Sequence, residues 1–149
     1  MRVSVRLLTA CALAGCGGGT LGTTLTAPSP APAPDVFQCA RNNLKAVDFS
    51  QSSYDVEEQR FTARRFDYET RRADVTFRRM VDRLEVDAAP GEKGAMTTLK
   101  ITARTFGEYT TQRGPTEVEE RASETARNAA QKLLDLCHTP ADSTSVPGT

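Results

Sequence analysis

Apolar and polar residues alternate with period two through the middle of the chain, which is the pattern of half-buried β-strands. The clearest alternation covers two runs joined by residues 89–94, whose sequence Ala-Pro-Gly-Glu-Lys-Gly is typical of a turn. The apolar positions of the two runs are Leu84, Val86, Ala88, Leu99, Ile101 and Ala103. The pattern predicts a β-hairpin with one apolar and one polar face. From Phe49 the pattern already shifts toward period two, with Phe61 and Ala63 on one face, which predicts two further strands before the hairpin.

Two segments repeat apolar residues at the spacing of an α-helix. In the first, Asp35 and Gln38 fit a capping pair at the helix start. Its apolar face comprises Val36, Ala40, Leu44 and Val47. The second follows Gly114-Pro115, where Thr116 and Glu119 fit a capping box, and runs to about Cys137. Its apolar stripe comprises Val118, Ala122, Ala126, Ala129, Leu133 and Leu136.

These elements predict an α+β fold of order α-β-β-β-β-α. We expect an antiparallel sheet with both helices packed on one face, because each strand of the hairpin has only one apolar side. The stretch 67–79 supports a helix turn or a strand equally, and we treat it as a connection.

The amino terminus has the pattern of an export signal. Arg2 and Arg6 precede the apolar run 7–14, which is too short to cross a bilayer because a membrane-spanning helix needs about 20 apolar residues. The run ends in Leu13-Ala14-Gly15-Cys16. This motif resembles the lipobox of bacterial lipoprotein precursors. The resemblance implies that residues 1–15 are a signal peptide and that Cys16 becomes the first mature residue, carrying a diacylglyceryl group and often a further acyl chain such as palmitate.

The resemblance covers only the first 16 residues, and it implies where the protein is located without implying anything about the folded part. It implies a protein anchored to the cell membrane through its lipid. Gly17, in place of the aspartate that favours inner-membrane retention, favours the periplasmic face of the outer membrane over the inner membrane. An ordinary secretory signal whose exit happens to contain a cysteine is the alternative interpretation.

Composition divides the rest of the chain. Residues 16–34 contain the lipidated cysteine and a Gly/Thr/Pro-rich segment without charged residues, which predicts a tether. Residues 35–138 form one α+β domain, and residues 139–149 have the composition of a disordered tail. The folded domain is distantly similar to the helix-grip domains of envelope lipoproteins that assemble barrels, a likeness of element order that transfers no site.

Two cysteines, Cys39 and Cys137, remain once Cys11 leaves with the signal and Cys16 takes lipid. Since export leads to a compartment where disulfides form, we expect a Cys39–Cys137 disulfide. The alternative, a redox or metal-binding thiol pair, lacks Cys-x-x-Cys spacing and has only His138 as an extra ligand. We therefore expect no metal site.

Charge is balanced, with 19 Lys+Arg against 19 Asp+Glu in 149 residues, which argues against nucleic-acid binding. The densest basic run contains Arg60, Arg64, Arg65, Arg71, Arg72, Arg78, Arg79 and Arg83. Acidic residues interleave with it, so a solvated, salt-bridged sheet face is one interpretation. The other is contact with an anionic partner through Arg64, Arg65, Arg71, Arg72, Arg78 and Arg79. The aromatic residues in the run form either a binding platform or a layer packed under arginine stems.

Catalytic constellations are missing from the sequence. The acidic run Glu117, Glu119, Glu120 and Glu124 is explained by its place in the first turns of the predicted second helix, where the macrodipole favours negative charge. The only histidine, His138, sits in the predicted tail, so no Ser/His/Asp set is expected, and the glycines at 17–19 follow a cleavage site and not a strand, unlike a phosphate-binding loop. We expect neither an enzyme nor a cofactor.

Two functional hypotheses follow. The first is an envelope lipoprotein that acts as a structural or protein-interaction module, with an envelope protein as partner. The second is a carrier that holds a lipid or other amphiphile between helix and sheet, lined by residues such as Leu84, Val86, Leu99, Ile101 and Leu133. A packed interior would favour the first, and a cavity of several hundred Å³ the second.

Overall fold

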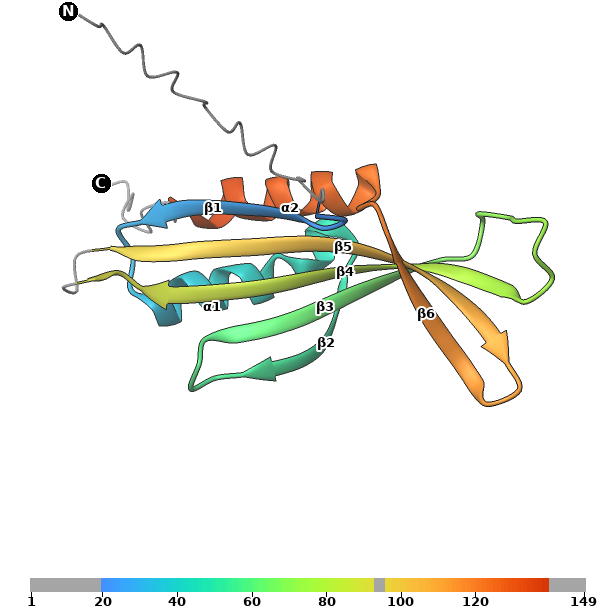
Figure 1. Cartoon of the computed structure of the whole chain (residues 1–149). Coiled ribbons are helices and arrows are strands. Elements are labelled where there is room, and N and C mark those ends of the chain that lie inside the picture. The colour runs from blue at the N-terminus through green and yellow to red at the C-terminus, as the bar shows by residue number, and fades with distance from the viewer. Residues whose placement is uncertain (1–19, 93–95, 140–149) are drawn as a thin grey trace, which may run out of the picture.

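The structure is a computed structural model that describes residues 20–92 and 96–139. The signal peptide, Cys16 and nearly all of the predicted tail lie outside the described residues, as does part of the predicted hairpin turn. The described chain has the α+β fold that the sequence predicts (Figure 1). Its strands are β1 (Thr23–Ser29), β2 (Ser50–Asp55), β3 (Arg60–Asp67), β4 (Phe77–Pro90), β5 (Thr97–Thr111) and β6 (Gly114–Glu120). The helices are α1 (Ala33–Asn42), followed by a 3₁₀ turn (Leu44–Val47), and α2 (Glu124–Cys137).

The six strands form one antiparallel sheet in the order β1-β5-β4-β3-β2. Strand β5 is long enough to pair along the same edge with β1 over its first half and with β6 over its second half. Both helices cover one face of the sheet, as predicted, and Figure 1 looks onto the sheet with α1 behind it. The far ends of β4, β5 and β6 extend beyond the helices.

The predicted hairpin is confirmed as β4 and β5. Leu84 pairs with Ala103, Val86 with Ile101 and Ala88 with Leu99, which is the register the alternation requires. All of these side chains have 0% exposure. The helices supply the other half of the core: Val36, Phe37, Ala40, Ala126, Ala130, Leu133 and Leu134.

The predicted tether is wrong at residues 23–29 and at its end, where α1 begins at Ala33. Thr23–Ser29 forms β1, paired residue by residue with β5 from Thr23 opposite Ala103 to Ser29 opposite Thr97. Leu25 and Ala27 pack against the core, which stabilises a strand that composition alone disfavours. The proline at position 28 is tolerated because β1 lies at the edge of the sheet.

The start of α1 also differs from the prediction. The helix begins at Ala33 after Pro32, with a proline in its first turn, and no side chain caps it. A proline there loses nothing, because the first N–H groups of a helix have no partner within it. Asp35 lies in the first turn instead of preceding the helix.

The second helix starts later than the sequence predicts. Gly114, at φ +109°, begins strand β6, and α2 begins only after Ser123, whose Oγ accepts from the N–H of Ala126. Ala126, Ala129 and Leu133 are buried as expected. Val118 lies on β6 with 52% exposure, and Leu136 is 41% exposed, so both are wrongly placed by the helical stripe.

The Cys39–Cys137 disulfide is confirmed and joins α1 to the end of α2. The Cα atoms lie 5.7 Å apart, and the bridge spans a sequence separation of 98 residues. It therefore closes a loop that contains most of the sheet.

Candidate functional site

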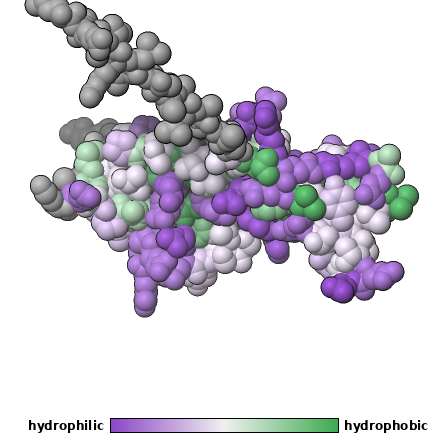
Figure 2. Space-filling view, viewed as in Figure 1, coloured by the Kyte–Doolittle hydropathy of each residue, from purple (hydrophilic) through white to green (hydrophobic). Residues whose placement is uncertain are grey.

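The face of the sheet turned away from the helices is polar, and we call it the open face. Its central positions are Arg60, Thr62, Arg64, Arg83, Glu85, Asp87, Lys100, Thr102 and Arg104, which alternate with the buried positions of β3, β4 and β5. Figure 2, in the same view as Figure 1, shows hydrophilic residues over most of this side. The open face contains an open hollow of about 380 Å³, lined mainly by Arg60, Glu85, Asp87, Lys100, Thr102 and Arg104, so a partner on this face would meet charged side chains.

Three arginines form a row across the open face. Arg64 lies opposite Arg83, and Arg83 lies opposite Arg104. Like charges directly opposite one another destabilise a sheet, so the row needs compensation. Arg83 pairs with Glu117 of β6 at 3.0 Å, and Arg104 lies 3.4 Å from Glu85.

The positive charge of Arg64 is balanced differently from the charges of Arg83 and Arg104. Its guanidinium lies 5.1 Å from the ring centroid of Phe66, and it has no carboxylate within ion-pair distance among the described residues. Its side chain is exposed on strand β3. Arg64 is therefore the member of the row that keeps its charge available to a partner.

Aromatic side chains lie under the arginines next to this row. Phe66 and Phe106 both pair with Val81, so the three side chains form an apolar strip across the open face. The guanidinium of Arg79 lies 3.9 Å from the ring centroid of Phe66, and that of Arg83 lies 4.6 Å from Phe106. Of the two interpretations of the aromatic residues, the geometry favours packing under arginine stems.

The six arginines proposed for an anionic partner do not share one surface. Arg64 and Arg79 lie on the open face, whereas Arg65 lies on the helix side, 3.2 Å from Asp48 and 3.6 Å from Asp82. Arg78 and Arg79 both pair with Glu108, at 3.1 and 3.0 Å. Arg71 donates to the backbone carbonyl of Tyr68, and Arg72 pairs with Glu120 at 2.6 Å. Most of these charges are thus already matched by carboxylates.

The sequence prediction missed the role of Arg83 and Arg104. The basic run contains Arg83, and Arg104 is one of the polar positions of the predicted hairpin, but neither is predicted to form a row with Arg64. The signal was present, because a hairpin that sets Leu84 opposite Ala103 also sets Arg83 opposite Arg104.

Arg72 forms the tightest polar cluster on the extension beyond the helices. Its two Nη atoms donate to the Glu120 carboxylate at 2.6 and 2.7 Å, and Nη1 also donates to the Tyr109 hydroxyl at 2.7 Å. The hydrogen bonds from Arg72 lower the pKa of Glu120 and raise the pKa of Arg72 itself. Gly107 leaves room for this cluster, since a Cβ there would lie 2.9 Å from both Glu120 Oε1 and the Tyr109 ring.

The acidic run has a different role from the one predicted. Glu117, Glu119 and Glu120 lie on β6 and pair with Arg83, Arg104 and Arg72 respectively, so the macrodipole interpretation is wrong for these three. It holds for Glu124, which lies in the first turn of α2.

A buried carboxylate fixes the start of α2 to the sheet. Asp82 is 3% exposed, and its Oδ1 accepts from Thr105 Oγ1 and Ser123 Oγ, both at 2.7 Å. The Thr105 hydroxyl in turn accepts from the Ser123 N–H at 2.8 Å. Every group in this network has a partner, which indicates a structural role.

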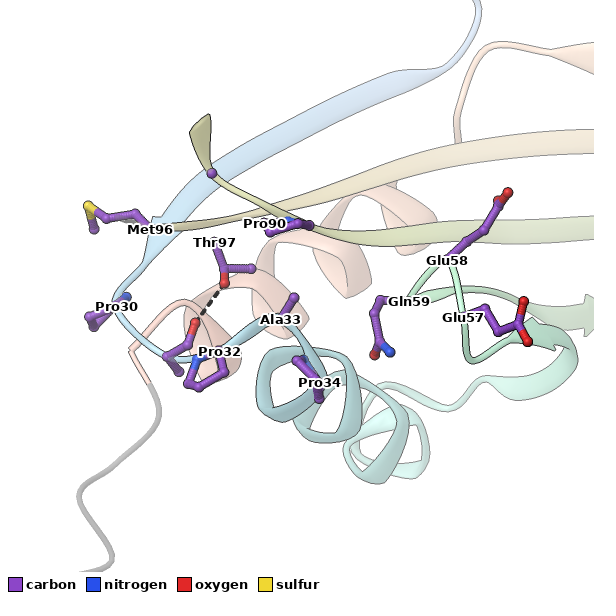
Figure 3. A pocket seen from close by; sticks show the side chains of 12 residues that line it. Pro30, Pro32, Ala33, Pro34, Glu57, Glu58, Gln59, Pro90, Met96 and Thr97 are labelled. Atoms are coloured by element: carbon purple, nitrogen blue, oxygen red, sulfur yellow. Dashed lines mark hydrogen bonds between the residues drawn. The ribbon is translucent and has the colours of Figure 1, made fainter. Parts of the chain in front are cut away.

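A separate cleft of about 510 Å³ lies at the end of the sheet opposite to the extension that carries Arg72. It is bounded by the β1–α1 turn, the β2–β3 turn and the end of the β4–β5 hairpin (Figure 3). Thr97 Oγ1 donates to the Ala31 carbonyl at 2.7 Å and holds one wall, and Gln59 Oε1 is buried there without a hydrogen-bond partner among the described residues. Prolines at positions 30, 32, 34 and 90 make much of the lining apolar.

Within residues 20–92 and 96–139, no group of three or more His, Cys, Asp or Glu side chains could hold a metal ion. No helix in the same ranges is long and apolar enough to cross a membrane.

Comparison with known proteins identifies no family. No protein-family model and no curated protein sequence matches this chain. Among solved structures, the chain is similar to an uncharacterised protein from Bacillus thuringiensis, with 10% sequence identity and a TM-score of 0.32, over 78% of this chain and 92% of that one. A likeness at this TM-score supports no statement about function.

Proposed function

We propose that this chain is a lipid-anchored protein of the bacterial cell envelope that acts by contact with a partner. The observation that carries the proposal is the packed interior. Leu84, Val86, Leu99, Ile101 and Leu133, which would line a carrier cavity between helix and sheet, all have 0% exposure. A side chain that lines a ligand cavity keeps surface accessible to a water-sized sphere, and these five keep none. What the fold offers to other molecules is therefore its surface.

The anchor in this proposal is Cys16, on the strength of the lipobox-like motif. The disulfide supports export, because such bonds persist in oxidising compartments and are rare in the cytosol. Two or three acyl chains would hold the protein at the membrane, since each buried CH₂ contributes about 0.8 kcal/mol. The proposed location is the periplasmic face of the outer membrane.

The contact surface in this proposal is the open face, centred on Arg64. Its partner is an envelope protein or another envelope component that presents anionic groups. Arginine suits this role because its planar guanidinium binds carboxylates and phosphates through paired hydrogen bonds. The balanced total charge argues against a nucleic-acid partner.

A Cys16→Ser variant tests the anchor. A hydroxyl is a far weaker nucleophile than a thiol, so we expect an uncleaved precursor without lipid, visible as a higher mass and as loss of the acyl adduct in mass spectrometry. A Cys11→Ser variant is the matched control and should be processed normally. Normal processing of Cys16→Ser, with membrane association that survives high salt, would show that the lipoprotein interpretation is wrong.

The end cleft favours a second candidate function, the carriage of a small amphiphile. The cleft has the volume of a small-molecule site, about 510 Å³, and prolines at positions 30, 32, 34 and 90 give it an apolar lining. Displacement of a fluorescent fatty acid tests this. An Ala31→Phe change, which fills the cleft, should abolish binding, and Ala89→Phe outside the cleft should leave it unchanged. Equal binding by both variants, or none by the wild type, excludes the carrier.

A further inference from the structure

The point where the chain enters the fold lies on one edge of the sheet. Strand β1 starts at Thr23, opposite Ala103 in the middle of β5, and the carbonyl of Leu21 accepts from the N–H of Ala122 at 2.9 Å. These bonds fix residues 21–23 in the junction between β1, β6 and the start of α2. In Figure 1 β1 and β6 lie along this edge, and β2 lies at the opposite edge.

Only a short connection separates this junction from Cys16. A chain extends at most about 3.6 Å per residue, so Leu21 lies within about 18 Å of Cys16 in any conformation. A lipid on Cys16 would place that residue at the membrane surface. The paired start of β1 replaces most of the long tether that composition suggests, so the domain can move only about 18 Å from the anchor and its entry edge stays close to the bilayer.

The side chains around the junction suit a membrane surface. Leu21 is 47% exposed and Val118 of β6 is 52% exposed. The three glutamates of β6 are each paired with an arginine, whereas Arg121, which follows them, is exposed and has no ion-pair partner among the described residues; the same holds for Glu124 in the first turn of α2. Apolar side chains next to a free cation fit the boundary between anionic headgroups and acyl chains.

We infer that the edge formed by β1 and β6 faces an anionic phospholipid bilayer, and that β2, whose six residues are all exposed, points away from it. This inference rests on the proposed anchor at Cys16. In this orientation the open face is turned sideways, neither toward the membrane nor away from it, so a partner in the envelope can reach it. From β6 to β2 the sheet crosses four strand spacings, or about 19 Å.

The chain contains no tryptophan, so a single introduced tryptophan reports one position. Val118→Trp and Tyr54→Trp are a matched pair, because the native side chains are 52% and 57% exposed and lie on the two opposite edges. Each lipidated full-length variant is reconstituted into vesicles of phosphatidylglycerol and phosphatidylethanolamine that contain a headgroup-labelled energy acceptor. We expect energy transfer from Val118→Trp to be about twofold or more stronger, given the roughly 19 Å between the edges. Equal transfer, or stronger transfer from Tyr54→Trp, overturns the inference.

A lengthened connection tests the cause of the orientation. Inserting about 20 Gly/Ser residues after Gly17 raises the mean reach by about 25 Å and should bring the two transfer efficiencies close together. A ratio unchanged by the insertion would overturn the role of the short connection. Mass spectrometry of the same samples separates the two proposals: absence of lipid on Cys16 contradicts the proposed anchor, whereas lipidated protein with equal transfer contradicts only the orientation.

Discussion

Removing the disulfide should cost a large part of the domain's stability. The bridge closes a loop of 98 residues, and loop-closure entropy for that length is worth about 4.7 kcal/mol at 25 °C. Residual structure in the denatured chain reduces this, so we expect a Cys39→Ala/Cys137→Ala variant to lose about 3–4.7 kcal/mol of unfolding free energy. The melting temperature should fall by about 15 °C.

The loss should come from the denatured state, because the two helices also pack through apolar side chains that the change leaves in place. Urea titration followed by circular dichroism measures it, with reduced wild type as the control. Both proteins should show a lower midpoint and a larger dependence of free energy on urea, since an unlinked chain exposes more surface. A loss below about 1 kcal/mol, or an unchanged urea dependence, would refute the loop-closure argument.

Three further predictions concern polar clusters. Ser123→Ala should lower the unfolding free energy by about 1–2 kcal/mol, because it removes the cap of α2 and a hydrogen-bond partner of the buried Asp82. In the same urea titration the control variant Thr125→Ala should change the unfolding free energy little. The Arg72 hydrogen bonds that lower the pKa of Glu120 stabilise the fold at pH above its ordinary value of 4.5, so the stability gap between wild type and Glu120→Gln, about 1 kcal/mol at pH 7, should shrink as the pH falls below 4.5; a gap that does not shrink below that pH contradicts this. If the open face meets an anionic surface, changing Arg64 to Gln should weaken binding of the lipid-free domain to anionic vesicles by about fivefold, at about 1 kcal/mol for one residue, whereas no salt-sensitive binding by the wild type at 0.15 M salt would favour the solvated face.

The parts of the fold that the sequence predicts are those with one buried side. The β4–β5 hairpin and the core face of α2 follow from apolar residues at the right period, because burial imposes that period. The disulfide follows from counting cysteines in an exported chain.

The sequence does not predict strands β1 and β6, because neither has a regular buried side. β6 has no buried residue, so no alternation marks it, and the capping-box pattern of Thr116 and Glu119 favours a helix instead. β1 contains a proline and lies in a Pro/Thr-rich segment, and it forms because β5 offers it a free edge. Pairing of this kind depends on residues 68 to 80 positions away in the sequence, and local propensity does not contain it.

The sequence predicts how many arginines the sheet carries, but it predicts only part of their arrangement on the open face. The number of charges is visible in the sequence, and so is the opposition of Arg83 and Arg104 once the hairpin register is known. The distribution of Arg65 and Arg72 to the helix side follows from strand parity and from the path of residues 68–76, which no periodicity describes.

Photo-crosslinking in the intact envelope tests the central claim, contact through the open face, most directly. A photoreactive amino acid at Thr102 lies on the open face, and one at Gln131 lies on the exposed side of α2. The proposal predicts a discrete adduct from position 102 that is lost when Arg64 is changed to Gln, and no such adduct from position 131. The same adducts from both positions, or none from position 102 in correctly anchored protein, would contradict it.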